Sequence, residues 1–207
     1  MQSDFWDQRY AGEDYAYGTE PNAFLVSQAG RLAPGLRVLA VGEGEGRNAV
    51  WLAGRGLEVL AVDGSVVGLA KARALAAERG VSIATEHADL TAWRWPRAGF
   101  DAVIAIFVHF PPAERARMHA AMFAALKPGG LLILEAFTPE QLQYRTGGPP
   151  VRGMLYDAAM LRGDFPGAEI VLLEETLADV REGAYHHGRA AVVRAVLRRP
   201  SGSAQRS

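Results

Sequence analysis

Cysteine is absent from this chain of 207 residues, which excludes disulfides, thiolate metal sites and a cysteine nucleophile. Lysine is scarce as well, since Lys71 and Lys127 are the only two, and the formal net charge of -1 leaves no basic excess. Binding that neutralises a phosphate backbone is therefore disfavoured, and we expect no nucleic-acid partner. No apolar run approaches the roughly 20 residues that span a bilayer, so we expect no membrane partner.

The N-terminus also lacks a signal-peptide pattern, because Met1-Gln2-Ser3-Asp4 is polar and acidic. We therefore expect a cytoplasmic protein. With 49% hydrophobic residues, the chain suits one globular domain, predicted over residues 1–199. Residues 200–207 are predicted to be a disordered tail.

The most informative stretch runs from Val38 to Asn48, where a buried strand leads through Gly42, Gly44 and Gly46 into a helix. Alternate glycines let a ligand approach the main chain, as in nucleotide-binding loops. Glu43 and Glu45 lie between these glycines, and their negative charge would repel a pyrophosphate. An adenosyl cofactor without phosphates, carrying an amino group and a sulfonium, meets no such conflict, which favours S-adenosylmethionine.

Strand and helix patterns alternate after this loop. Val66–Arg79 and Pro112–Leu126 have helical spacing, and Phe100–Phe107 is an apolar run typical of a strand buried on both faces. The remaining expected elements are a helix at Asn48–Arg55 and strands at Leu57–Val62, Val81–His87 and Leu131–Ala136, with Lys127–Gly130 ending the preceding helix. This order predicts an α/β fold with a doubly wound, mainly parallel sheet.

The C-terminal part departs from that alternation. The strand-like runs 168–180 and 189–197 are joined by a connection too short for a crossover helix, so they should pair antiparallel. We therefore predict a Rossmann-like sheet of seven strands, one of them reversed. His186 and His187 in the connection have no supporting ligand spacing, so no metal site is predicted.

Two flanking segments are candidates for covering a substrate. The first, 1–36, is predicted as an N-terminal lid and helix, with irregular aromatic residues at Phe5–Tyr17 and a helix beginning near Thr19-Glu20-Pro21. The second, 137–167, is predicted as a substrate-side insertion opening with a capping box at Thr138–Gln141.

Five motifs in this order resemble the class I S-adenosylmethionine-dependent methyltransferases, and more narrowly their small tellurite-resistance-like branch. The resemblance covers nearly the whole chain. Its motifs are Trp6–Tyr10 with Tyr17–Asn22, Gly42–Asn48, Val62-Asp63, Ala88–Leu90 and Leu126–Gly130.

The resemblance implies roles for particular residues. The loop should pass under the methionine part of the cofactor, Asp63 should accept the ribose hydroxyls, and Asp89 with Leu90 should border the adenine. Tyr10, Tyr17 and Phe107 are the rings expected near the sulfonium. The predicted cofactor-binding set is Tyr10, Tyr17, Gly42, Glu43, Gly44, Glu45, Gly46, Asn48, Asp63, Gly64, Ser65, Asp89, Leu90 and Phe107. The family usually has an acid where this chain has Ala40, which leaves Glu43 or Glu45 to orient the amino group.

His109 follows the central strand and is the candidate catalytic base, although a packed, hydrogen-bonded histidine is the competing interpretation. The expected activity is methyl transfer from S-adenosylmethionine to a small-molecule acceptor, such as a thiol or a tellurium or selenium oxyanion. Two alternatives remain open. The first is an NAD-dependent oxidoreductase, because Gly44–Ala49 also satisfies GxGxxA and Asp63 has the spacing expected for an NAD ribose. The second is a non-catalytic S-adenosylmethionine-binding protein, because Ala40 stands where the family usually has an acid.

Overall fold

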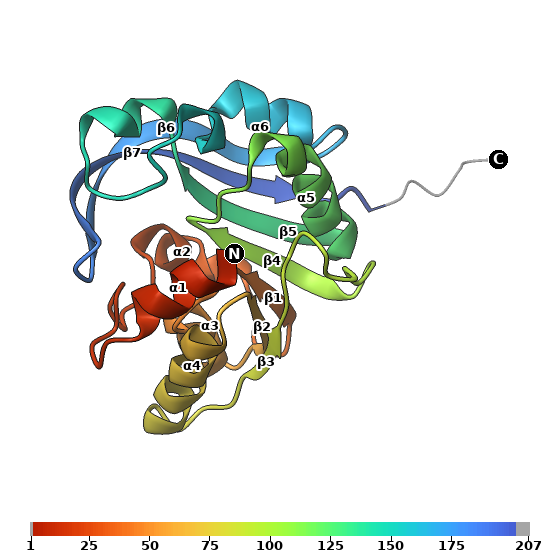
Figure 1. Ribbon diagram of the computed structural model, residues 1–207. Helices are drawn as coiled ribbons and strands as arrows, with labels where there is room; N and C mark the ends of the chain where they lie inside the picture. Colours follow the sequence, from red (N-terminus) through yellow and green to blue (C-terminus); the bar gives the residue numbers. More distant parts are fainter. Residues whose placement is uncertain (1, 202–207) are drawn as a thin grey trace.

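One sheet of seven strands organises the protein, with helices on both faces (Figure 1). The computed structural model describes residues 2–201. The strands follow the order β3-β2-β1-β4-β5-β7-β6. Their bounds are β1 (Arg37–Val41), β2 (Glu58–Asp63), β3 (Ala84–His87), β4 (Phe100–Ile106), β5 (Leu126–Phe137), β6 (Glu169–Glu182) and β7 (His186–Arg198). Only β7 is reversed, pairing antiparallel with β5 and β6, so the predicted fold is confirmed.

Six α-helices and three short 3-10 helices complete the described part of the chain. They are α1 (Gln2–Tyr10), α2 (Ala23–Ser27), η1 (Ala29–Arg31), α3 (Arg47–Gly54), α4 (Val66–Glu78), α5 (Pro112–Ala125), η2 (Pro139–Gln143), η3 (Arg152–Met154) and α6 (Ala158–Asp164). Helices α1 to α4 gather on one side of the sheet, and α5 with α6 on the other (Figure 1). Within residues 2–201, every helix is too short or too polar to cross a membrane.

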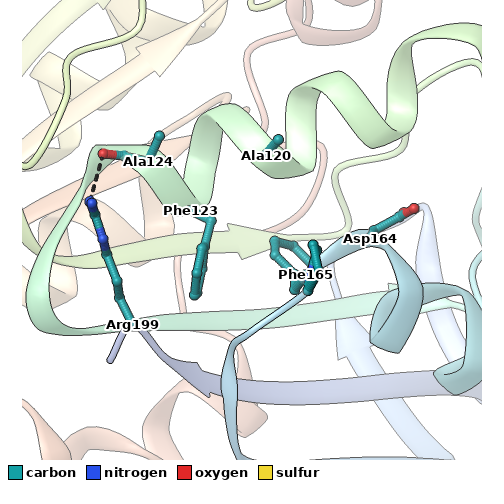
Figure 2. A pocket seen from close by; sticks show the side chains of 7 residues that line it. Ala120, Phe123, Ala124, Asp164, Phe165 and Arg199 are labelled. Atoms are coloured by element: carbon teal, nitrogen blue, oxygen red, sulfur yellow. Dashed lines mark hydrogen bonds between the residues drawn. The ribbon is translucent and has the colours of Figure 1, made fainter. Parts of the chain in front are cut away.

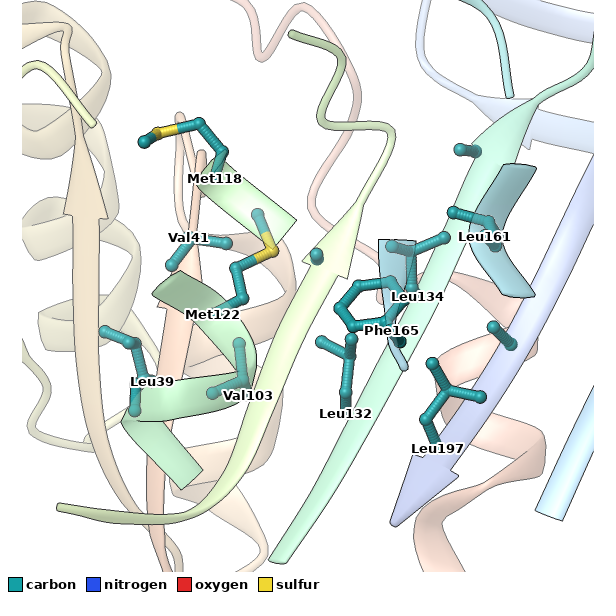
Figure 3. Close-up of a cluster of buried hydrophobic side chains, with 14 of the residues drawn as sticks. Leu39, Val41, Val103, Met118, Met122, Leu132, Leu134, Leu161, Phe165 and Leu197 are labelled. Carbon is teal, nitrogen blue, oxygen red and sulfur yellow. The ribbon is translucent and has the colours of Figure 1, made fainter. Parts of the chain in front are cut away.

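Strand β1 separates the two halves of the core. Leu39 and Val41 belong to a buried cluster with Met122 of α5 (Figure 3). Val38 and Ala40 point the opposite way, into a cluster shared with α2 and α3. Because successive side chains of a strand alternate between faces, the apolar run of β1 serves both layers at once.

The N-terminal segment differs from its prediction. The first half of Phe5–Tyr17 is not irregular, because α1 extends to Tyr10. The next helix begins at Ala23 rather than near Thr19, since the side-chain oxygen of Asn22 accepts the main-chain N–H of Leu25 at 2.9 Å and caps α2 there.

Other boundaries also move. Lys127–Gly130 is part of β5, because Leu126 already pairs with Phe100 before a register shift. The expected strand start at Val81 is wrong, since its N–H bonds back to the carbonyl of Ala76 in α4. Thr138 precedes a 3-10 helix and makes no side-chain capping bond.

The C-terminal hairpin is tighter than expected. Strand β7 begins at His186, so only residues 183–185 form the turn. Of the predicted disordered tail, residues 202–207 lie outside the described residues.

Helix α6 is attached to α5 by an ion-paired cluster. Arg115 donates to Asp164 at 2.7 Å, and Nδ1 of the fully buried His119 lies 2.8 Å from the same carboxylate. Burial alone would raise the pKa of Asp164, but the hydrogen bonds from His119 and Arg115 outweigh it and lower the pKa. The ionised carboxylate therefore stabilises the fold above its unfolded pKa near 3.8, and this contribution fades as the pH falls.

We expect Asp164→Asn to reduce the free energy of unfolding by about 2 kcal/mol at pH 7, because the buried His119 and the partly buried Arg115 lose a charged acceptor. The loss should shrink toward pH 3, because the contribution of the ionised carboxylate fades as the pH falls below the unfolded pKa near 3.8. Urea unfolding at both pH values measures this. Asp179→Asn, on an exposed position of β6, is the matched control and should change little. An equal loss at both pH values would contradict the assignment.

Candidate active site

The candidate site lies where β1 and β4, neighbours in the sheet, send their chains to opposite faces. Such a switch point opens a crevice at the carboxyl ends of parallel strands. The glycine loop 42–46 follows β1, and Phe107 follows β4. The two segments touch, because a Cβ on Gly42 would lie 2.7 Å from Cγ2 of Val108.

Two further glycines allow close approaches to this loop. Gly44 and Gly46 have φ angles of 57° and 89°, in the left-handed region that favours glycine. A Cβ on Gly44 would lie 2.5 Å from the hydroxyl of Tyr10, and one on Gly46 would lie 2.6 Å from Cβ of Ala72. The loop is thus held between α1 and α4.

Asp63 ends β2 directly beside this loop. Its Oδ2 accepts the N–H of Gly44 at 2.8 Å, and its Oδ1 accepts the N–H of Ser65 at 2.7 Å. Burial raises the pKa of Asp63 despite these two bonds. The carboxylate is therefore fixed against the main chain of the loop, at the position predicted for a ribose contact.

The connection after β3 lies next to Asp63. The N–H of Ala88 donates to the carbonyl of Asp63 at 2.9 Å, and a Cβ on Gly64 would lie 3.8 Å from the carbonyl oxygen of Ala88. Asp89 accepts the hydroxyl and N–H of Thr91, which lowers its pKa. Leu90 is buried in the same cluster as Val41 and Val62. The structure thus brings these predicted adenine neighbours to the same edge of the sheet.

Both glutamates of the loop are bonded to protein. Oε1 of Glu43 accepts the N–H groups of Asn48 and Ala49 at 2.9 and 2.7 Å, at the start of α3. Glu45 pairs with Lys71 at 2.9 Å. These bonds give both carboxylates a structural role, and their contact with the amino group of a cofactor stays a prediction.

The side chains of Asn48 and Ser65 also make hydrogen bonds within the protein. The side-chain oxygen of Asn48 accepts the N–H of Asn22 at 2.9 Å. The Ser65 hydroxyl donates to Asp7 of α1 at 2.5 Å and accepts the N–H of Gly68 at 3.0 Å, capping α4. Both residues therefore attach N-terminal segments to the loop region.

The N-terminal segment covers the glycine loop. Tyr10, 6% exposed, reaches Gly44 from the end of α1. The Tyr17 hydroxyl accepts a hydrogen bond from Arg9 at 3.2 Å, and the Arg9 guanidinium stacks on Tyr185 at the turn between β6 and β7. The cover is thus attached to the C-terminal hairpin as well as to the loop.

An aromatic cluster lies beside this cover. Phe107, with an unusual φ of 55°, stacks on Phe137 with ring centroids 4.3 Å apart. The His186 ring is 4.8 Å from that of Phe107 and 4.6 Å from that of Tyr17. Positive φ at a bulky residue is costly and often occurs at functional sites. Tyr17 and Phe107, predicted separately, therefore meet through His186.

His109 uses both ring nitrogens for main-chain bonds. Its Nδ1 lies 2.7 Å from the carbonyl of Met154, and its Nε2 accepts the N–H of Phe137 at 3.3 Å. Burial is the main cause that lowers the pKa of His109 to about 4. The geometry favours the packed-histidine interpretation over the catalytic base.

Sequence reasoning assigned no role to a buried charged network near the loop. Asn22 donates to Glu135 at 2.6 Å and to Glu182 at 2.9 Å, and Arg194 donates to Glu135 at 2.7 Å. Arg47 donates to Glu182 at 2.8 Å. A glutamate within the apolar run of β5 was the one sequence signal, because buried acids require partners.

A cavity of about 290 Å³ lies elsewhere, between α5 and the end of α6 (Figure 2). Its lining is mostly apolar, and its Arg199 is bonded to the main-chain carbonyls of Ala124 and Leu126. Among residues 2–201, no group of three or more potential ligands could hold a metal.

These features define an α/β domain with a Rossmann-like sheet of seven strands, one of them reversed. Residues 38–130 match the family described as Methyltransferase domain. A curated relative, the glycine/sarcosine N-methyltransferase of Halorhodospira halochloris, is 35% identical over 107 residues, covering 48% of this chain and 39% of its own length. The chain therefore spans about two fifths of that relative.

Solved structures share the fold across nearly the whole chain. One, from work on the conversion of a disulfide bond into a thioacetal group during echinomycin biosynthesis, has a TM-score of 0.79 at 23% identity, covering 99% of this chain and 94% of its own. TehB from Haemophilus influenzae has a TM-score of 0.72 at 16% identity, covering 96% and 67%.

The family match and the curated relative both concern methyltransferases, and the solved structures share the fold. They do not separate the tellurite-resistance-like branch from the rest of the class. Because neighbours at this identity also include a cyclase, they show the fold and leave the reaction to be argued from the site.

Burial raises the pKa of Glu43 from 4.5 to about 7. A raised pKa means that Glu43 favours folding at low pH, and that this contribution is lost as the pH rises toward 7. Glu43→Gln keeps an oxygen for Asn48 and Ala49 without the charge. We expect the variant to match the wild type near pH 4.5 and to be more stable by up to about 3 kcal/mol at pH 8.

Urea unfolding at pH 4.5 and pH 8 tests this prediction. Glu43→Ala is the control, because it removes the cap and should be destabilised by about 1 kcal/mol at low pH. A difference between Glu43→Gln and wild type that does not depend on pH would show that Glu43 is not held with a raised pKa.

Proposed function

We propose that this protein transfers the methyl group of S-adenosylmethionine to a small-molecule acceptor. One observation carries the proposal: the buried Asp63 carboxylate is held 2.8 Å from the N–H of Gly44, at the switch point between β1 and β4. A glycine loop with a carboxylate about 20 residues further on suits the ribose of an adenosyl cofactor.

The residues present fit this cofactor. The orphaned Nη1 of Arg47 gives the described site a spare buried donor, and Asp63 gives it a fixed acceptor. Asp63 would hold the ribose, and Asp89 with Leu90 would border the adenine. Because the Asp63 carboxylate lies against the main chain of the loop, a pyrophosphate is disfavoured there, and with it the NAD alternative.

When bound, S-adenosylmethionine supplies a methyl group on a sulfonium that is already a good leaving group. What remains for the protein is to orient the acceptor and exclude water. Tyr10 and Tyr17 form the cover that would exclude water, and the attachment of Arg9 to Tyr185 would hold that cover in place. This role makes residues 1–36 a lid.

The aromatic cluster forms the proposed acceptor side. Phe107, Tyr17 and His186 present rings that would stabilise positive charge near the transferring methyl. The insertion 137–167 would close this side, since a Cβ on Gly147 would clash with the ring of His186. So closely packed a wall favours a small acceptor.

Two classes of small molecule are candidates for the acceptor. The resemblance to the tellurite-resistance-like branch suggests a thiol or a tellurium or selenium oxyanion, and the TehB likeness agrees with it. The glycine/sarcosine relative suggests a small amine. Formation of S-adenosylhomocysteine across glycine, sarcosine, thiols, selenite and tellurite distinguishes these classes.

Binding of the cofactor is tested first. In a thermal-shift assay with S-adenosylmethionine and with NAD, only S-adenosylmethionine should raise the unfolding temperature of the protein. Stabilisation by NAD alone would overturn the proposal. If S-adenosylmethionine binds and no acceptor in the screen yields S-adenosylhomocysteine, the non-catalytic alternative is supported.

Asp63→Ala should weaken S-adenosylmethionine binding by at least about tenfold, because charge-assisted bonds to the ribose are lost. Isothermal titration calorimetry measures the affinity, and urea unfolding shows whether the fold is retained. Asp101→Ala is the matched control, since this partly exposed aspartate pairs with Lys127 at the opposite end of the sheet. Unchanged affinity in Asp63→Ala would rule out the ribose assignment.

His109→Gln should leave the pH dependence of kcat/KM unchanged between pH 6 and 9, because the wild-type pKa is about 4 and both ring nitrogens are already bonded. The profile is measured with an acceptor found in the screen. Loss of an inflection near neutral pH would instead identify His109 as the catalytic base.

A further inference from the structure

Arg47, the first residue of α3, has a hydrogen-bond donor to spare. Its side chain is 9% exposed, and Nη2 donates to Oε2 of Glu182 at 2.8 Å. Nη1 is buried and has no hydrogen-bond partner among the residues that the structure describes. Leaving such a donor unpaired away from water is costly, so the site favours an acceptor brought by a ligand.

The carboxylate that binds the other arm of Arg47 already has several donors. Glu182 accepts from Arg47, from Asn22 at 2.9 Å and from His186 at 3.2 Å. Burial would raise the pKa of Glu182, but the hydrogen bond from His186 and the charge of Arg47 outweigh it and lower the pKa to about 2. Glu182 therefore stays ionised and holds one arm of the Arg47 guanidinium.

The position of Arg47 connects the two halves of the proposed site. On one side it follows Gly46 and begins α3. On the other, its partner Glu182 holds His186, whose ring contacts Tyr17 and Phe107. A ligand bonded to Nη1 would thus lie between the glycine loop and the aromatic cluster.

The surrounding charges limit the chemistry of that ligand. A guanidinium arm suits a planar carboxylate. A phosphate dianion would be repelled by the carboxylates of Asp63 and Glu182, which are bonded to Gly44 and Arg47. The same acids would attract an ammonium group. A carboxylate that carries its own ammonium, as in an α-amino acid, satisfies both conditions.

We propose that Nη1 of Arg47 binds the carboxylate of an α-amino acid group held beside the glycine loop. The inference rests on the proposed function, since that group belongs either to the methionine end of the cofactor or to an amino acid acceptor. Arg47 would select for this end of the molecule and take no part in proton transfer.

Decarboxylated S-adenosylmethionine is the discriminating probe, because it keeps the sulfonium and amine and lacks the carboxylate. Calorimetry compares its affinity with that of S-adenosylmethionine, for the wild type and for Arg47→Lys. Arg47→Lys keeps a cation for Glu182 and removes the second guanidinium arm. A second variant, Arg47→Met with Glu182→Gln, removes both charges and so leaves neither unpaired. Arg115→Lys is the matched control, because Arg115 of α5 pairs with Asp164 of α6 in the same way.

If the cofactor supplies the carboxylate, the wild type should prefer S-adenosylmethionine by about 10- to 100-fold, and both Arg47 variants should lose most of that preference. If an acceptor supplies it, the preference is absent, and glycine binding to the complex with S-adenosylhomocysteine should weaken by about tenfold or more in Arg47→Lys.

Equal binding of both cofactors together with unchanged glycine binding in Arg47→Lys would overturn the assignment of Arg47 alone. Failure of the folded wild type to bind S-adenosylmethionine would instead overturn the proposed function. Urea unfolding of each variant shows whether the fold is retained, so that loss of structure is not mistaken for loss of the contact.

Discussion

The carboxylate of Glu182 is the contact on which the arrangement of the site depends. It accepts from Arg47 at the start of α3, from Asn22 before α2 and from His186 at the start of β7. Three segments far apart in the sequence are therefore held at one buried point. Because an ionised carboxylate in the interior must be fully paired, each segment has little freedom to move without exposing charge.

The conformation of the glycine loop is required for packing within the protein as well as for the proposed ligand. Gly44 gives room to Tyr10 and Gly46 gives room to Ala72, while Glu43 caps α3 from within the loop. The same close packing brings Asp63 against the main chain of Gly44. The residues proposed to bind the cofactor therefore also pack the loop, so the sequence motif alone does not separate the two roles.

The sequence predicted the sheet well, because hydrophobic runs and glycine signals act locally. The buried run of β4 and the two C-terminal strands followed from periodicity and from the shortness of their connection. The sequence predicted the helix that ends at Tyr10 and the cap at Thr138 less well. The aromatic residues of α1 follow no clear apolar stripe, and Thr138 makes no capping bond although its sequence context suggests one.

What the sequence by itself determined is the class of fold and the position of the glycine loop, because strand order and glycine spacing are encoded over short stretches. Only the tertiary structure decided how the polar residues are used. Glu135 pairs with Arg194 through the register of β5 and β7, and both nitrogens of His109 meet main-chain groups. These partners lie far apart in the chain, so burial and charge pairing, which depend on the folded arrangement, selected them.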